Sequence, residues 1–189
     1  RERHHFDGQL LVTQLREWAH GLGFSQIGVS GVDLGVAESG LRDWLAQGFH
    51  GSMHYMQRHG SKRARPAELV PGTLSVITAR MDYLGADIAA AARCLAGPER
   101  GYIARYALGR DYHKTLRQRL QKLADRITAE IRPHNYRVFT DSAPVMEKPL
   151  AEAAGLGWIG KHTNLINRSA GSCFLLGEIY TDLPLAVDT

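Results

Sequence analysis

The chain has 189 residues, of which 44% are hydrophobic and 22% are charged, enough to bury one sizeable core. No apolar run approaches the roughly 20 residues of a membrane-spanning helix, and the N-terminal stretch lacks a signal-peptide core. We therefore expect one soluble, cytoplasmic and monomeric domain over residues 1–189, with no membrane contact. The net charge of +4 and the pI near 9.2 permit a polyanionic partner without requiring one.

Cysteine and histidine usage argues against a metal site. Cys94 and Cys173 are far apart in a chain with only 2 cysteines, so neither a disulfide framework nor a CxxC motif is present. The 9 histidines are scattered along the sequence. We expect no zinc, iron–sulfur or other metal ligation by this chain alone.

The first third of the chain is predicted to form a helix, a strand and a second helix. Residues 9–20 have apolar residues at helical spacing behind a candidate N-cap, Asp7, and end near two glycines. Residues 24–30 predict a strand, and residues 36–49 a short helix. The residues expected to face inward are Leu11, Leu15, Trp18 and Leu22 in the first helix and Leu41, Trp44 and Leu45 in the second.

A long loop over residues 48–66 leads to the clearest β-branched strand, residues 73–84. Loops of more than about 12 residues in a compact domain usually have a function or are disordered. We therefore expect this loop to contribute to function.

The second half contains the best helix of the chain, residues 111–131, with Asp111 as its N-cap. Residues 135–140 predict a strand, residues 147–155 a short helix and residues 172–182 a final strand. We expect an α/β or α+β fold, with about four or five strands in a mixed sheet flanked by helices. The apolar face of the long helix consists of Leu116, Leu120, Leu123, Ile127 and Ile131.

Asp141 follows the strand at residues 135–140 and precedes Pro144, which biases the chain away from helix. One interpretation is that Asp141 and Ser142 cap the next helix. The other is that Phe139, Ala143 and Val145 desolvate the acid, keep it protonated and make it a proton donor. Position alone favours neither.

The segment GLGWIGKHTNLIN, residues 155–167, offers glycines for close backbone approach and then Lys161, His162, Thr163 and Asn164 as donors. It matches neither the GxxxxGK[ST] nor the GxGxxG pattern, so a nucleotide phosphate loop is not supported. A bulky ligand bearing amide or phosphate groups would suit it. The alternative is a tight turn between a helix and a strand.

Two basic segments could contact RNA. One is residues 101–113, and the other is the end of the long loop with Lys62, Arg63 and Arg65. Together with Arg110, Lys114 and Arg117 they could form a basic rim for RNA phosphates, although a solvated charged face is the commoner outcome. The residues of these segments predicted to bind RNA or another substrate are Arg105, Tyr106, Arg110, Tyr112, His113, Lys114 and Arg117.

Four segments taken together resemble the N-terminal half of the epoxyqueuosine reductase family. They are RARPAELVPGTLSVI, ARYALGRDYHKTLRQRL, FTDSAPVMEKPLAEAAGLGWIGKHTNLIN and GSCFLLGEIYTDLPL. The resemblance implies a cobalamin-dependent, iron–sulfur oxidoreductase that reduces epoxyqueuosine to queuosine at the tRNA wobble position, the last step of queuosine biosynthesis. It also implies an α/β fold related to nitroreductases and to the cobalamin-binding domain of reductive dehalogenases.

The resemblance carries specific roles onto this sequence. Asp141, in the Asp-Ser-Ala-Pro motif, would be the catalytic proton donor. The positions that the family's cobalamin-contacting motifs bring in are Arg63, Ala104, Lys148, His162, Thr163 and Asn164.

The family continues into a ferredoxin-like domain that holds two 4Fe–4S clusters, followed by helical repeats that help hold tRNA. This sequence stops at Thr189. We therefore expect it to supply the acid and one wall of the cobalamin site, to work with that C-terminal domain, and to be inactive alone.

Two other function classes stay open. A flavin-dependent reductase of nitroreductase type would share the fold, and an absorption spectrum would separate flavin from corrin. A non-catalytic RNA-binding module is supported by the basic segments alone.

Overall fold

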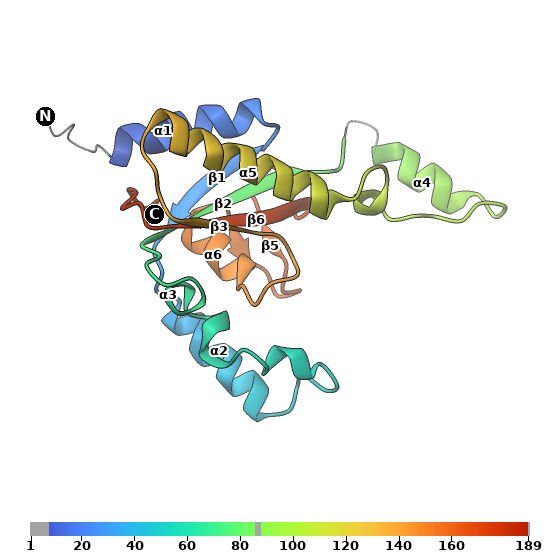
Figure 1. Ribbon diagram of the computed structural model, residues 1–189. Coiled ribbons are helices and arrows are strands. Elements are labelled where there is room, and N and C mark those ends of the chain that lie inside the picture. The colour runs from blue at the N-terminus through green and yellow to red at the C-terminus, as the bar shows by residue number, and fades with distance from the viewer. Residues whose placement is uncertain (1–7, 86–87, 189) are drawn as a thin grey trace, which may run out of the picture.

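The computed structural model describes residues 8–85 and 88–188, and its centre is a four-stranded sheet (Figure 1). The strand order is β1-β2-β6-β3, and each neighbouring pair is antiparallel. A separate two-stranded sheet pairs β4 with β5. The strands are β1 (Gln26–Ser30), β2 (Ser75–Asp82), β3 (Tyr136–Phe139), β4 (Trp158–Ile159), β5 (Leu165–Ile166) and β6 (Phe174–Thr181).

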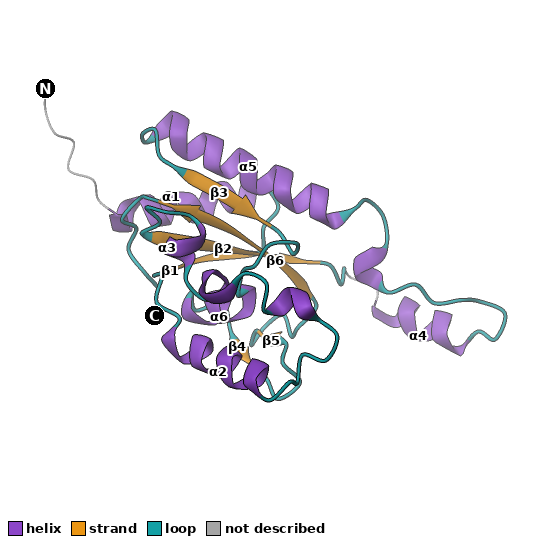
Figure 2. Ribbon diagram, turned by 60° about the horizontal axis from the view of Figure 1, so that its bottom comes forward, coloured by secondary structure: helices purple, strands orange, loops and turns teal. Residues whose placement is uncertain are grey.

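Helices cover both faces of the four-stranded sheet. α1 (Gly8–Gly21) and α5 (Tyr112–Glu130) lie on one face, and α6 (Glu147–Ala153) lies on the other (Figures 1 and 2). The helices outside these layers are α2 (Gly35–Ala46), α3 (Pro66–Leu69), α4 (Ile88–Ala96) and the 3-10 turns η1 (His54–Met56), η2 (Gly60–Arg63) and η3 (Arg105–Ala107). α2 and α4 project from the sheet in different directions. None of the described helices is long and apolar enough to cross a bilayer.

Two glycines let the helices approach the sheet closely. A Cβ on Gly177 of β6 would lie 2.8 Å from Leu120 Cδ1 and 2.9 Å from a methyl of Leu116, so α5 packs directly over this strand. A Cβ on Gly28 of β1 would lie 2.1 Å from the backbone oxygen of Ala154, at the end of α6. The sheet is therefore held tightly between α5 and α6.

Most of the elements predicted from the sequence are confirmed, including the leucine face of α5 and its Asp111 N-cap. The sheet has four strands flanked by helices, as expected, but every strand pair is antiparallel rather than mixed. Asp7 lies outside the described residues. The inward residues of the first helix pack as predicted, with Leu11 and Leu15 fully buried and Trp18 and Leu22 partly buried.

Two predictions about helices were wrong or incomplete. No described side chain of α2 is fully buried, and Leu41, Trp44 and Leu45 are only partly buried because the helix projects from the body. α4 was not among the helices predicted from the sequence, although the alanine-rich segment that forms it has high helix propensity.

Buried polar side chains lie on the α6 side of the sheet. Glu178 of β6 is fully buried and stands opposite Thr78 of β2. Both carboxyl oxygens of Glu178 and the hydroxyls of Thr78 and Ser30 have no hydrogen-bond partner within the described residues. Burial holds the pKa of Glu178 well above its usual range, with smaller contributions from the charges of Glu147 and Asp141. Burial therefore favours the neutral, protonated form of Glu178.

A neutral buried acid predicts that the stability of the wild-type protein decreases with rising pH. Above about pH 4.3 the unfolded chain loses the Glu178 proton while the folded state keeps it, so the free energy of unfolding falls. Glu178→Gln keeps the shape and removes the titration. We expect thermal unfolding between pH 5 and 8 to show a smaller loss of Tm in the variant. About 1 kcal/mol corresponds to about 2–4 °C at this size, so the difference is measurable. Parallel Tm curves for the two proteins would contradict a neutral Glu178.

Candidate functional site

Asp141 lies two residues after the end of β3, in a backbone conformation that few residue types adopt. Its φ is +59°, in the left-handed region that Asp and Asn tolerate better than other non-glycine residues. The side chain is 47% exposed. The turn therefore places the carboxyl outward from the edge of the sheet instead of into the core.

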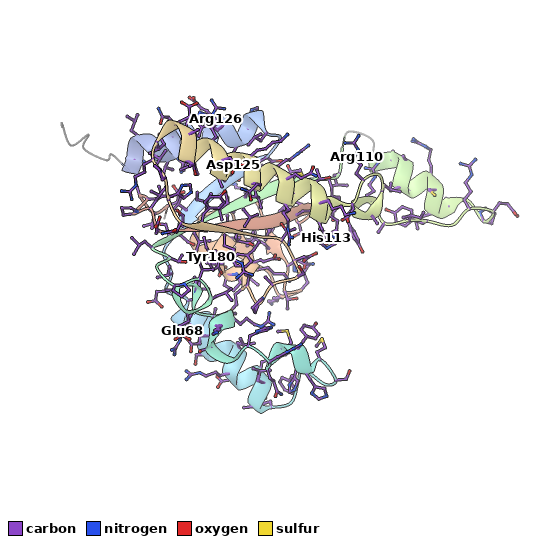
Figure 3. The ribbon with its side chains drawn as sticks, in the orientation of Figure 1. Glu68, Arg110, His113, Asp125, Arg126 and Tyr180 are labelled. Atoms are coloured by element: carbon purple, nitrogen blue, oxygen red, sulfur yellow. The ribbon has the colours of Figure 1, made fainter. Side chains whose placement is uncertain are left out.

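The first two residues of α5 hold this carboxyl. The phenol of Tyr112 donates a hydrogen bond to Asp141 Oδ2, and His113 Nε2 lies 2.9 Å from the same oxygen. The rings of Tyr112 and His113 are stacked, with centroids 3.9 Å apart. Burial, followed by the hydrogen bond to Asp141, raises the pKa of Tyr112, so the phenol stays protonated and can donate. Figure 3 shows His113 at this end of α5.

His113 bridges two carboxyl groups. Its Nδ1 lies 3.0 Å from Oδ1 of Asp111, which also accepts the backbone N–H of His113 as the N-cap of α5. A neutral imidazole donates through one nitrogen only. If Nδ1 donates to Asp111, the contact between Nε2 and Asp141 needs a further proton, on the imidazole or on the carboxyl. The contacts of His113 therefore join the carboxyls of Asp111 and Asp141 in one hydrogen-bonded group.

Glu147 fixes the backbone of Asp141 from the other side. Its Oε1 accepts the Asp141 N–H at 2.9 Å. The predicted capping role of Asp141 and Ser142 is wrong, because the N-cap of α6 is Met146 and no side chain bonds there. Instead of Asp141 capping α6, the side chain of Glu147, the first residue of α6, holds the turn that contains Asp141.

The predicted apolar enclosure of Asp141 is also absent from the described structure. Phe139 and Val145 are buried in a core cluster, with Ala143 packed against it. The Asp141 carboxyl stays nearly half exposed. These residues therefore pack the sheet beneath the turn and do not cover the acid.

A cavity of about 320 Å³ adjoins Glu147 and Lys148. Arg63 of η2 lines it, and Arg63 Nε is buried with no hydrogen-bond partner among the described residues. Its apolar lining comes from Leu41, Met56, Val145, Met146 and Pro149. The long loop at residues 48–66 thus reaches the start of α6, and its functional use stays a prediction.

Lys148 joins this cavity to the glycine-rich segment. Its Nζ donates to the backbone oxygen of Thr163 at 2.7 Å and lies 3.5 Å from Asn164 Oδ1. Thr163 and Asn164 form the turn of the β4–β5 hairpin, with His162 exposed beside them. The structure therefore brings together four of the six predicted cofactor contacts at and around α6, with Arg63 across the cavity.

The glycine cluster forms a hairpin rather than a plain turn between a helix and a strand. A Cβ on Gly157 would lie 2.2 Å from the backbone oxygen of Ile166, so the two strands could not approach with a larger residue there. The hairpin turn closes through Gly160 N–H to the oxygen of Asn164 at 2.9 Å.

The remaining cofactor residue, Ala104, immediately precedes η3. In that turn Tyr106 packs edge-on against Tyr112, with ring centroids 6.2 Å apart, and likewise against Tyr83. Arg105 donates to the backbone oxygen of Leu84. The segment therefore reaches the Asp141 site through Tyr106 and Tyr112.

The predicted basic rim divides into separate surfaces. Arg65 is ion-paired with Glu38 at 2.9 Å and Glu68 at 2.8 Å. This part of the chain lies on the opposite side of the sheet from α5. Arg110 and Lys114 instead line a groove of about 510 Å³ along α5. Arg117 is not among its lining residues, whereas Lys122 is.

Sequence reasoning missed Glu147 and Glu178 as site residues. Glu178 had a usable signal, because it is the one charged residue in the interior of the predicted strand at residues 172–182, whose other charged residue, Asp182, is terminal. Glu147 had none beyond its place six residues after Asp141, since only the folded turn brings its carboxyl to the Asp141 backbone.

The sequence matches known proteins over most of its length. The family model described as "Epoxyqueuosine reductase QueG, DUF1730" matches residues 63–142. The epoxyqueuosine reductase of Pseudomonas aeruginosa is 58% identical over 96% of this chain, and that of Escherichia coli is 53% identical over 94%. The chain covers 50% and 47% of those two proteins, so it spans about half the length of the relatives it matches.

Solved structures show the same fold. An epoxyqueuosine reductase in complex with an epoxyqueuosine-modified stem loop of tyrosine tRNA superposes with a TM-score of 0.81 at 24% identity, covering 95% of this chain and 47% of that one. A reductive dehalogenase, whose structure suggests a mechanism for B12-dependent dehalogenation, gives a TM-score of 0.58 at 18% identity, covering 100% of this chain and 22% of that one. The chain belongs to the epoxyqueuosine reductase family and corresponds to about half of the length of its members.

Proposed function

We propose that this chain provides the catalytic acid and one wall of the cobalamin pocket of an enzyme that reduces epoxyqueuosine to queuosine in tRNA. The observation that carries the proposal is the Asp141 carboxyl, presented outward by a left-handed turn and held by Tyr112 and His113. Support comes from relatives at 53–58% identity that are epoxyqueuosine reductases. The two 4Fe–4S clusters of the proposed enzyme would lie in the rest of the protein.

The residues present fit cobalamin. Arg63 Nε is a buried donor without a partner at the cavity, and the hairpin turn exposes His162, Thr163 and Asn164 beside it. Amide and phosphate groups of the cofactor could accept from such donors, while the apolar lining suits the corrin edge. Arg63, Ala104, Lys148, His162, Thr163 and Asn164 would hold the cofactor, which supplies the reducing electrons when bound.

The chemistry of this chain is proton delivery. Opening an epoxide places negative charge on the departing oxygen, and a positioned acid that neutralises this charge lowers the barrier. Asp141 would give its proton through the carboxyl oxygen that Tyr112 and His113 leave free. His113 and Tyr112 orient the group, and Glu147 keeps its backbone in place.

The groove along α5 is the proposed contact for the tRNA backbone. Its lining contains four cations, Arg110, Lys114, Arg119 and Lys122, and one acid, Asp111. The contact to tRNA rests on the neighbouring structure that contains a tRNA stem loop and on this charge. Arg105, Tyr106, Tyr112 and His113 lie nearer the acid and would face the modified nucleoside.

Replacing the acid separates chemistry from folding. In a protein of the relatives' full length, Asp141→Asn keeps the side-chain shape and tolerates the left-handed backbone, but it cannot give a carboxylic proton. We expect turnover of epoxyqueuosine in tRNA to fall at least about a hundredfold, with cobalamin affinity in a spectral titration unchanged.

Two further substitutions serve as controls for this experiment. Asp141→Ala should lose similar activity and also about 1–2 kcal/mol of stability, because Ala is strained at φ +59°. Asp141→Gly should recover that stability without recovering activity. Near-normal turnover in Asp141→Asn would assign the proton to another group.

The cations of this groove predict how strongly tRNA binding depends on salt concentration. Lys114→Gln combined with Lys122→Gln should weaken tRNA binding and lower the slope of log K against log salt by about 2, one for each lost phosphate contact. Arg117→Gln removes a charge from the same helix outside the groove and should change the slope less. An unchanged slope in the double variant would leave these lysines as a solvated face.

A further inference from the structure

Reduction of an epoxide to an alkene consumes two electrons and two protons and releases one water. Asp141 is the one acid that the proposed function uses, so a second proton has to reach the site in each turnover. A second carboxyl, that of Glu147, contacts the backbone of the Asp141 turn. Glu147 accepts the Asp141 N–H at 2.9 Å and lines the 320 Å³ cavity beside it.

Burial disfavours the charged form of Glu147, whereas the Asp141 N–H and the charge of Lys148 act in the opposite direction with smaller effect. The neighbouring ammonium of Lys148 donates to the backbone of Thr163 and makes no ion pair with Glu147 among the described contacts. Behind Glu147 lies the buried and unpartnered carboxyl of Glu178. The titratable or charged groups that face it are Asp141 on the turn, Tyr112 and His113 on α5, Lys148 on α6, Glu178 and Tyr180 on β6, and Arg63 across the cavity.

We propose that Glu147, with Glu178 behind it, stores the second proton of the reaction and returns it to Asp141 after Asp141 has given up its own. The inference rests on the proposed function. In this step the O–H bond of Glu147 breaks and that of Asp141 forms, so Glu147 becomes a carboxylate and Asp141 is neutral again. The two electrons come from the reduced cofactor of the proposed enzyme. Glu147 acts through Asp141 and is therefore a positioning residue.

The electrostatics are consistent with this role. Burial raises the pKa of Glu147 to about 7, and the charge of Asp141 adds to the effect. A carboxyl with this pKa is about half protonated at neutral pH, so it can both hold and release a proton there. β6, whose eight residues are all described, contains no Lys, Arg or His that could pair with the Glu147 carboxylate.

The test compares two glutamates of the same helix in a protein of the relatives' full length. Glu147→Gln keeps an oxygen to accept the Asp141 N–H but cannot store a proton. Glu152→Gln is the matched control, because Glu152 Oε1 accepts the backbone N–H of Ile159 at 2.8 Å in the same manner. We expect kcat to fall at least about tenfold in Glu147→Gln, with KM and cobalamin affinity unchanged, and no loss in Glu152→Gln.

Two readouts report the proton itself. The wild-type kcat should decline as pH rises through about 7, the pKa of Glu147, and Glu147→Gln should lose this decline. Infrared titration of the protein without substrate should show a protonated carboxyl band that disappears near the same pH, is absent in Glu147→Gln and is retained in Glu152→Gln. This second readout does not require turnover and also works if Glu147→Gln folds poorly, since the wild-type band alone is informative.

The outcomes separate the two proposals. If the wild-type protein does not reduce epoxyqueuosine, the proposed function fails, and the infrared titration still decides whether Glu147 stores a proton. Absence of a carboxyl band that titrates near neutral pH overturns the inference. So does a Glu147→Gln variant with wild-type kcat and pH profile.

Discussion

The hydrogen bonds that hold the Asp141 turn between α5 and α6 determine what this site can do. The start of α5 contributes Tyr112 and His113 to the carboxyl, and the start of α6 contributes Glu147 to the backbone. Each helix is fixed to the sheet at a glycine, Gly177 under α5 and Gly28 against the end of α6. The position of one exposed carboxyl therefore depends on close helix packing on both faces of the sheet.

The fold was largely accessible from the sequence because its signals are local. The leucine face of α5, the Asp111 cap and the β-branched run of β2 each specify an element without reference to the rest of the chain. The antiparallel pairing of all four strands depends on long-range contacts that a pattern does not contain. The partial exposure of α2 likewise depends on where the chain places the helix, although its apolar spacing is regular.

The site was accessible only in part. Asp141, Lys148 and the Thr163–Asn164 turn came from a family resemblance; the structure places Lys148 against that turn, and the roles of these residues stay predictions. The role of Glu147 could not be seen, since Asp141 and Ser142 looked like caps for the helix that Glu147 begins. A cap and an anchored turn use the same residue types at nearly the same spacing, and only the direction of the hydrogen bond distinguishes them.

The distribution of charge around Asp141 is unusual for an exposed acid. Lys148 donates to Thr163, and His113 contacts both Asp111 and Asp141. The carboxyls of Glu147 and Glu178 lie behind it without an ion-pair partner among the described contacts, and burial favours the neutral form of both. A site that had only to bind an anion would place cations here. The Asp141 site instead has two carboxyls whose protonated forms are favoured by burial. A protonated carboxyl near neutral pH is a group that can donate a proton in general acid catalysis.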